Sequence, residues 1–273
     1  MHYVENTPFL LSGGADESIR LFNLTEAKEQ GTILFHHGDV NAIEFAGKEM
    51  FLSGGSDGKV VLWKTKDWSR VKTLGSHRSS VHHLCLHPSN KVALSVGQDR
   101  TLRLWNLIKG SIGFVRKLKF EAWKVLFSPD ASEYVLLTTN KVIVYKTADG
   151  EESFTLENDL GWNDVAYLAV EFCIVVVGND KMIHLYSREG KLDLEGKVNG
   201  REIRTIASHT DLRLRTVQVV EVPKEKKLNS LVVTGSSDGR IQVWDVFEEE
   251  DQLLCEVKTS ERLVCCATLM KNC

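Results

Sequence analysis

Three sets of residues in the sequence combine the side chains that nucleophilic catalysis uses: a hydroxyl, an imidazole and a carboxylate. Each set has a tryptophan six residues after its Asp, and the sets are His37, Ser53, Asp57 and Trp63; His77, Ser95, Asp99 and Trp105; and His209, Thr234, Asp238 and Trp244. In a hydrolase, such a histidine activates the hydroxyl for attack on an acyl group while the carboxylate orients the ring. A catalytic triad occurs once, whereas this set recurs and each copy ends in tryptophan. The sets are therefore interpreted as structural clusters, and the chain is predicted not to be an enzyme.

A second stretch with potential chemistry contains His82, His83, Cys85 and His87. Zinc accepts these side chains as ligands. Successive residues of a strand point to opposite faces, so His82 and His83 diverge and zinc binding is not favoured. None of the six cysteines forms a Cys-x-x-Cys pair, and no phosphate-binding glycine loop or paired-carboxylate signature stands out. The sequence therefore predicts neither a metal nor a cofactor.

The elements that must carry these residues repeat along the chain. Each repeat has an apolar run, a turn rich in Gly, Ser, Asn or Asp, and a second apolar run that closes on an aromatic residue. The closing aromatics are Phe22, Trp63, Trp105, Tyr145, Tyr186 and Trp244. Their spacings are 41, 42, 40, 41 and 58 residues. Four of these match the ~40–45 residues of a propeller blade, and the fifth is about 17 residues longer. Strand pairs repeated in this way predict an all-β propeller.

Six repeat units are visible within a single predicted domain. The domain spans residues 1–273, its units end near residues 24, 65, 107, 147, 188 and 246, and closing strands are expected over 253–269. The C-terminal strands could pair with the N-terminal ones and close a six-bladed ring. The favoured alternative is a seven-bladed parent truncated at its N-terminus, because an open ring leaves an unpaired strand edge.

Composition and charge exclude several classes of protein. The chain has 273 residues, 42% of them hydrophobic and 26% charged, which is typical of a folded globular protein. No apolar run reaches the ~18 residues of a membrane helix, and no secretory signal is visible. The net charge is −3. Strong sequence-independent binding to nucleic acid requires clustered cations, so direct RNA binding by this chain is not expected.

The recurring pattern Ser/Thr-x3-Asp-x5-Trp, preceded by a histidine, resembles the WD-repeat signature. In WD-repeat blades the Asp bonds the histidine, the histidine bonds the hydroxyl, and the hydroxyl bonds the indole N–H. The resemblance implies such tetrads here. Four polar groups would be satisfied beneath each turn, and the turn would be locked in place.

One longer stretch narrows the resemblance. Residues 86–110, which contain His-Pro-Ser-Asn-Lys-Val-Ala-Leu-Ser-Val-Gly, resemble the third repeat of the p21-activated-kinase-interacting-protein-like WD-repeat family. The His36-His37-Gly38 opening and the segment 253–256 resemble it too. The resemblance implies a nucleolar scaffold for large ribosomal subunit assembly, located in the nucleus and nucleolus. For the animal branch it also implies binding to p21-activated kinase and restraint of that kinase. The family's Lys-rich C-terminal tail is not present in this sequence.

Candidate partner-binding residues are expected in the loops beside the Asp turns, and they are Arg78, Gln98, Arg100, Trp123, Lys141 and Lys181. Trp123 aligns with His82 of the preceding unit, near the loop end of a strand, and tryptophan is frequent at the energetic centres of interfaces. The alternative for Trp123 is packing beneath a degenerate turn. Two charged runs, residues 224–227 and 248–251, are either docking elements or solvated turns, and the solvated turn is favoured for both.

The favoured function is a non-catalytic scaffold in large (60S) ribosomal subunit biogenesis, with proteins of pre-ribosomal particles as partners. The alternative is an adaptor and negative regulator of p21-activated kinase signalling. A ubiquitin-ligase substrate receptor is disfavoured, because Phe247 stands where the Trp-Asp-x-Arg motif needs arginine. No sequence feature recommends an enzyme such as a propeller hydrolase.

Overall fold

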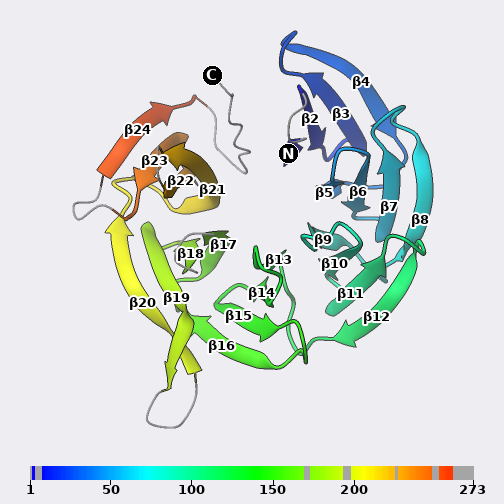
Figure 1. The fold of residues 1–273 in the computed structure, drawn as a ribbon. Coiled ribbons are helices and arrows are strands. Elements are labelled where there is room, and N and C mark those ends of the chain that lie inside the picture. Colours follow the sequence, from blue (N-terminus) through cyan, green and yellow to red (C-terminus); the bar gives the residue numbers. More distant parts are fainter. Residues whose placement is uncertain are drawn as a thin grey trace. The chain divides into compact units, whose positions relative to one another are not determined.

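The computed structural model describes residues 2–3, 8–168, 173–192, 198–224, 227–247 and 252–260. Its regular elements are all β-strands, arranged in six four-stranded antiparallel sheets (Figure 1). In each sheet the four strands follow one another in chain order. Four-stranded meanders of this kind are the blades of a β-propeller, which confirms the predicted fold class. The seven-bladed parent stays a prediction.

By its internal contacts the chain divides into two compact units, residues 1–138 and 139–273. The strands of the first unit are β1 (His2–Tyr3), β2 (Phe9–Gly13), β3 (Ser18–Asn23), β4 (Lys28–Leu34), β5 (Val40–Ala46), β6 (Met50–Gly55), β7 (Lys59–Lys64), β8 (Arg70–Ser76), β9 (Val81–Leu86), β10 (Val92–Gly97), β11 (Thr101–Asn106), β12 (Ser111–Lys117), β13 (Lys124–Phe127) and β14 (Glu133–Leu137). Those of the second unit are β15 (Lys141–Lys146), β16 (Glu152–Glu157), β17 (Trp162–Leu168), β18 (Cys173–Gly178), β19 (Met182–Leu192), β20 (Val198–Ala207), β21 (Leu214–Lys224), β22 (Lys227–Ser236), β23 (Arg240–Asp245) and β24 (Gln252–Lys258).

The outermost strands of the first three sheets are largely exposed. In the third sheet, β10 is buried over most of its length, whereas every residue of the outer strand β12 is exposed or half-buried. The inner strands are apolar runs that pack face to face with the neighbouring sheet, as β5 does against β9. Leu52, Val60, Leu84 and Trp105 meet in the core formed there. This core fixes the sheet ends, where the polar turns lie.

The predicted unit ends can be located relative to the strands. Residues 24, 65, 107, 147 and 246 each come directly after a third strand, while residue 188 lies inside β19. The extra length before Trp244 extends two hairpins, β19–β20 and β21–β22. Of the run 224–227, the described residues are Lys224 and Lys227, which pair at the ends of β21 and β22. Residues 248–251 and the part of the expected closing strands beyond residue 260 lie outside the described residues.

Candidate partner-binding surface

The His77 set forms the tetrad that the WD resemblance implies. His77 Nδ1 lies 2.9 Å from Asp99 Oδ1, and Nε2 lies 2.6 Å from Ser95 Oγ. Trp105 Nε1 donates to the same Ser95 oxygen at 2.8 Å. Because the Asp99 carboxylate only accepts, Nδ1 carries the proton and Nε2 accepts from the serine. Ser95 is fully buried, so no substrate can reach its hydroxyl, and the set ties strands to a turn rather than catalysing a reaction.

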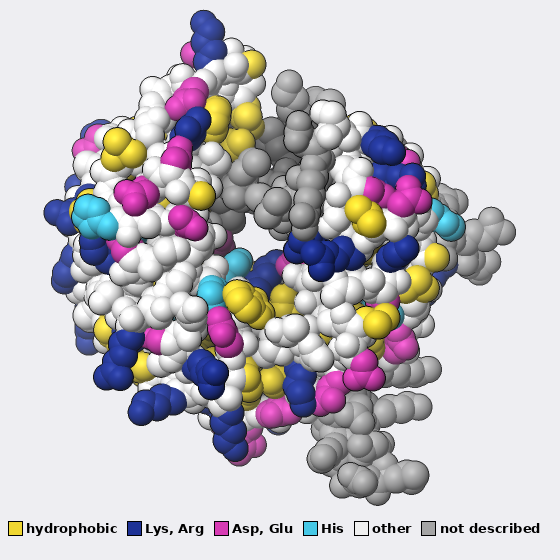
Figure 2. All heavy atoms as spheres, turned by 180° about the vertical axis from the view of Figure 1, so that it is seen from behind, with side chains coloured by type: hydrophobic (Ala, Val, Ile, Leu, Met, Phe, Trp, Pro, Cys, Tyr) yellow, Lys and Arg dark blue, Asp and Glu magenta, His cyan; other side chains and the backbone are white. Residues whose placement is uncertain are grey.

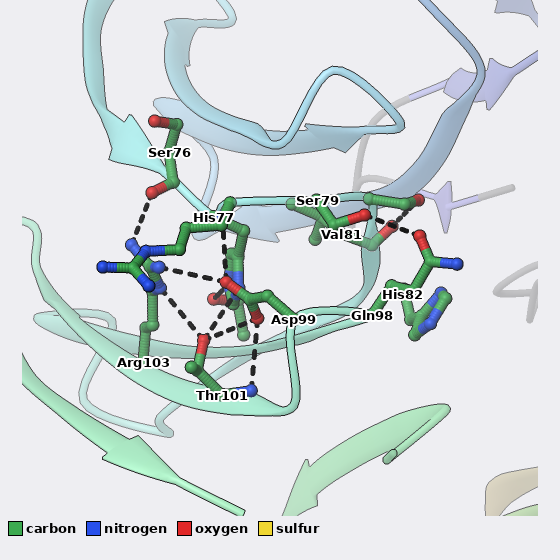
Figure 3. A network of polar contacts seen from close by, with 12 residues as sticks. Ser76, His77, Ser79, Val81, His82, Gln98, Asp99, Thr101 and Arg103 are labelled. Carbon is green, nitrogen blue, oxygen red and sulfur yellow. Dashed lines mark hydrogen bonds and ion pairs between the residues drawn. The ribbon is translucent and has the colours of Figure 1, made fainter.

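Two further side chains complete this cluster (Figure 3). Thr101 Oγ1 donates to Asp99 Oδ1 at 2.7 Å, and Arg103 Nη2 donates to Asp99 Oδ2 at 3.1 Å. Arg103 also donates to the carbonyl of Ser76. The sequence analysis missed both residues, although the spacing Asp-x-Ser/Thr-x-Arg recurs in the first sheet. There the same bonds join Asp16, Ser18 and Arg20.

In the fifth sheet a histidine occupies the position four residues after the Asp. His184 Nε2 lies 3.0 Å from Asp180 Oδ2, and Nδ1 lies 2.9 Å from Glu202 Oε1. Burial lowers the pKa of His184, but the two carboxylates outweigh it, so the pKa stands above its usual value. The position four residues after the turn Asp thus carries Arg in the first and third sheets and His in the fifth, and each bonds the carboxylate. The sequence already contained this signal.

The electrostatics of this cluster favour an ionised Asp99 and, because burial outweighs the attraction of that carboxylate, a neutral His77. Burial raises the pKa of Asp99, but the hydrogen bonds from His77, the Arg78 amide and Thr101 outweigh it and hold the pKa well below its usual range. For His77, burial dominates over the attraction of Asp99, and the pKa lies below its ordinary value. The cluster is therefore built for an ionised Asp99 and an uncharged His77.

In the second sheet the predicted tetrad histidine, His37, is wrong by one residue. The ring of His36 lies 3.0 Å from Asp57 and 2.7 Å from Ser53, and Trp63 donates to the same serine at 2.8 Å. His36 is buried and His37 is exposed. His37 contributes its backbone N–H, which donates to Asp57 Oδ2 at 3.1 Å.

In the sixth sheet the predicted tetrad is only half formed. Trp244 Nε1 donates to Thr234 Oγ1 at 3.2 Å, as expected, but His209 is exposed and does not bond Asp238. In the second and third sheets, the backbone amide that binds the carboxylate comes one residue after the tetrad histidine, His36 or His77. In the sixth sheet this amide belongs to Asp211, so Thr210 stands in the position of the histidine. The loop before this amide has no imidazole aimed at the carboxylate, and the assignment of His209 to the tetrad is corrected.

A small residue accompanies each imidazole. A Cβ on Gly55 would lie 2.7 Å from His36 Nδ1, and a Cβ on Gly97 would lie 2.8 Å from His77 Nδ1. The equivalent residue of the sixth sheet is Ser236, whose Oγ donates to Asp238 Oδ1 at 2.6 Å. The serine hydroxyl thus takes the hydrogen bond that the imidazole makes elsewhere.

Four of the predicted partner-binding residues lie in the first unit, three of them beside the third-sheet cluster and the fourth, Trp123, in the chain before β13. Arg78, Gln98, Arg100 and Trp123 are all exposed. The Arg78 amide donates to Asp99, and Gln98 Oε1 accepts from Ser79 Oγ at 2.6 Å. The chain before β9, the β10–β11 turn and the chain before β13 lie at one end of their sheets, so the four share that end.

Trp123 is held by a pair of residues that the sequence analysis did not join to it. Its ring lies 4.4 Å, centroid to centroid, from the ring of His82, and His82 Nε2 lies 2.7 Å from Glu121 Oε1. Trp123 is 48% exposed, so its ring is not packed beneath a turn. A large aromatic ring fixed in orientation and open to solvent is suited to contact with a protein partner.

The two lysines of the second unit differ in their surroundings. Lys141 Nζ donates to Glu157 Oε1 at 2.5 Å, so its charge is already matched. Lys181 is exposed and follows Asp180 in the β18–β19 turn with a backbone φ of +64°. Arg100, after Asp99, has the corresponding φ of +53°. This left-handed conformation disfavours residues with a side chain, and Gly58 and Gly239 hold the equivalent position in other sheets.

Neither a metal site nor a membrane-spanning helix is found in the part of the chain that the structure describes. Among the residues that the structure describes, no group of three or more His, Cys, Asp and Glu side chains is placed to hold a metal ion. Cys85 and Cys173 are buried, and burial raises the pKa of the Cys85 thiol. Across the described ranges, no helix is long and apolar enough to cross a membrane.

Comparison with known proteins agrees with this geometry. The WD domain, G-beta repeat, matches residues 28–64, 68–106 and 200–245. The p21-activated protein kinase-interacting protein 1-like of Gallus gallus is 35% identical over 269 residues, which cover 96% of this chain and 68% of the relative. Protein MAK11 of Saccharomyces cerevisiae is 26% identical over 94% of this chain and 69% of its own length. Shk1 kinase-binding protein 15 of Schizosaccharomyces pombe is 24% identical, over 87% of this chain and 64% of its own. The chain therefore belongs to the p21-activated protein kinase-interacting protein 1-like family of WD-repeat proteins.

Proposed function

We propose that this protein is a non-catalytic scaffold that holds protein partners during assembly of the large ribosomal subunit, in the nucleus and nucleolus. The observation that carries the scaffold is the contrast between the buried Ser–His–Asp sets and the exposed residues at the same end of the sheets. Ser53 and Ser95 are fully buried, whereas Arg100 and Trp123 are exposed. A sheet end that displays Arg and Trp suits protein recognition, because those residues dominate interface energies. The family resemblance of residues 86–110 supports the ribosomal setting.

Affinity purification tests the ribosomal role. The tagged chain should recover proteins of pre-ribosomal particles from nuclear extract, and its depletion should lower the amount of large subunits. Trp123→Ala should reduce recovery without lowering the melting temperature, since the ring lies at the surface. If no particle is recovered and subunit levels are unchanged, the ribosomal role is wrong.

A second candidate function is binding to a p21-activated kinase. Its support is the naming of relatives from Gallus gallus and Schizosaccharomyces pombe, which describes kinase-interacting or kinase-binding proteins. Purified chain and the purified regulatory segment of a p21-activated kinase should form a complex in a pulldown. Trp123→Ala should weaken this complex if the same surface is used. Absence of binding with purified components would exclude direct contact with that segment.

A further inference from the structure

A pocket of about 530 Å³ opens among three loops of the second unit. The loops are the β18–β19 turn, the connection from β20 to β21, and the β22–β23 turn. The lining residues are Asn179, Lys181, Asp211, Leu212, Arg213 and Ser237. All of them belong to the same end of the fifth and sixth sheets, which corresponds to the end at which Arg78 and Arg100 lie in the third sheet.

The one carboxylate that lines the pocket has an ion-pair partner, whereas its two cationic side chains have none among the described residues. Asp211 Oδ2 accepts from Arg240 Nη2 at 2.9 Å, so the one carboxylate of the lining is already neutralised. Within the described part of the chain, the Lys181 ammonium and the Arg213 guanidinium have no carboxylate partner, and the guanidinium makes only a long bond of 3.5 Å to the Asn179 amide oxygen. Both cations are exposed. The pocket therefore presents two positive groups that lack an anion.

The loops that carry these cations are fixed to one another. Asn163 Nδ2 donates to Asn179 Oδ1 at 2.9 Å and to the carbonyl of Leu214 at 2.6 Å, which ties the β18–β19 turn to the start of β21. The Ser237 amide donates to the carbonyl of Arg213 at 3.0 Å. A site whose walls are held before binding loses little conformational entropy when a ligand enters.

The backbone of Lys181 has a conformation that glycine adopts more easily than lysine. Its φ of +64° lies in the left-handed region, at a turn position that is glycine in two other sheets and is Glu17 and Arg100 in two more. A residue with a Cβ is strained in this region. Glycine would satisfy the backbone better, so the fold itself does not require lysine there.

We propose that this pocket binds an acidic side chain of a protein partner, with Lys181 and Arg213 contacting the carboxylate and Leu212 contacting an apolar neighbour in the same segment. Leu212 is 50% exposed at the rim. This assignment rests on the proposed role as a protein scaffold and names the chemistry of one partner segment. Single-stranded nucleic acid fits less well, because no lining residue is aromatic for base stacking and Asp211 faces the same space.

A phage-displayed library of random dodecapeptides tests the pocket without knowledge of the partner. Selection on the purified wild-type chain should enrich peptides with Asp or Glu beside an apolar residue. A synthetic peptide from the enriched pool should bind about tenfold more weakly to Lys181→Gly and to Arg213→Ser, since each variant removes one charge-assisted contact. Lys181→Gly should not lower the melting temperature, because glycine relaxes the left-handed turn. Lys146→Ser, at an exposed lysine of the same unit outside the pocket lining, is the matched control and should bind like wild type.

Three results would overturn the proposal: no enrichment of acidic peptides, enrichment that both pocket variants retain, or tight binding of a 20-nucleotide oligouridylate that the pocket variants lose. Because the selection uses the purified chain alone, its outcome is separate from that of the particle purification. If pre-ribosomal particles are recovered but the peptide selection shows no preference for acidic residues, only the pocket proposal is contradicted. If acidic peptides are selected but no particle is recovered, only the ribosomal role is contradicted.

Discussion

The imidazoles of His36 and His77 each connect a carboxylate on one side to a hydroxyl on the other, in a space that solvent does not enter. Each links a loop before the first strand of its sheet to the turn between the second and third strands. Removal of one partner leaves a buried donor or acceptor without a hydrogen bond, which costs more than the bond itself contributes. Single residues in these clusters therefore affect stability strongly, while their exposed neighbours do not.

The two adjacent histidines provide a direct test. His36→Ala should lower the free energy of unfolding by about 1–3 kcal/mol, because Asp57 and Ser53 lose their shared partner. His37→Ala should change it by less than about 0.5 kcal/mol, since the backbone N–H that binds Asp57 remains. Urea denaturation followed by tryptophan fluorescence measures both. Equal effects of the two substitutions would contradict the assignment of His36.

The His77 cluster also predicts the direction of pH dependence. The folded-state pKa of His77 lies below its unfolded value of 6.5, so the contribution of this residue is complete above pH 6.5. It is lost as pH falls through the folded-state pKa. The lowered pKa of Asp99 acts in the same direction, with a loss at pH below its usual 3.8. His184, whose pKa is raised, acts oppositely: its contribution is complete below pH 6.5 and is lost at higher pH.

The measurement is the urea midpoint at pH 7.5 and at pH 5.5 for the wild type, His77→Gln and His184→Gln. Relative to the wild type, His77→Gln should lose less stability on acidification, and His184→Gln should lose more. A His77→Gln variant that shows the wild-type pH dependence would mean that this imidazole does not hold its neutral form.

At the scale of the element, each Asp turn has one left-handed position whose side chain points away from the cluster. Glycine fills it in two sheets, and Glu17, Arg100 and Lys181 fill it in three others. Carboxylate hydrogen bonds fix the backbone on both sides, as Asp99 does by accepting from the Thr101 amide. The turn therefore keeps its shape whichever residue stands there, and this residue is available for recognition.

Arg100→Gly should raise the free energy of unfolding by up to about 1 kcal/mol or leave it unchanged, because glycine adopts a φ of +53° without a Cβ clash. Arg100→Val should lower it, since a β-branched residue is an outlier in this region. Thermal denaturation compares the two variants with the wild type. Destabilisation by Arg100→Gly would show that the side chain, rather than the backbone, supports the turn.

The strands and turns were predictable because their residues act locally. Gly and Asp mark the turns, and the closing aromatics mark the third strands at a nearly constant spacing. The histidine positions were less predictable, because a loop can lengthen and move the ring that reaches the carboxylate: one residue separates His36 from His37, and Thr210 replaces a histidine. The contacts of His82 with Trp123 and Glu121 were not predictable, since His82 reaches this loop only through the packing of neighbouring sheets.

At the scale of the whole chain, positive and negative side chains are mixed. Figure 2 shows Lys and Arg interspersed with Asp and Glu on the face it displays. The net charge is −3. Proteins that bind nucleic acid without sequence preference instead concentrate cations along one groove. The chain as a whole is suited to several separate protein contacts rather than to one extended polyanion.

The purified chain should therefore bind a 20-nucleotide single-stranded RNA no more tightly than about 100 µM at 150 mM salt, the weak limit of non-specific binding. Fluorescence anisotropy with a labelled oligonucleotide measures this. Saturable binding in the low micromolar range, which weakens steeply with added salt, would show a cationic surface that the charge distribution does not predict.

The contact between a glycine and an imidazole in the second and third sheets restricts the order in which these clusters can change. While His36 is present, any larger residue at Gly55 places a carbon 2.7 Å from its ring, so a glycine-first route passes through a strained intermediate. If His36 is lost first, the close contact that remains is with the Asp57 carboxylate, which a serine could bind as Ser236 binds Asp238. At Gly97 the carbonyl of Ser80 would still lie 2.7 Å from a Cβ, so that glycine is required even without His77. The sixth sheet corresponds to the end of the histidine-first route. A histidine could return to this sheet only after Ser236 had been replaced by glycine, so the histidine is lost more easily than it is regained.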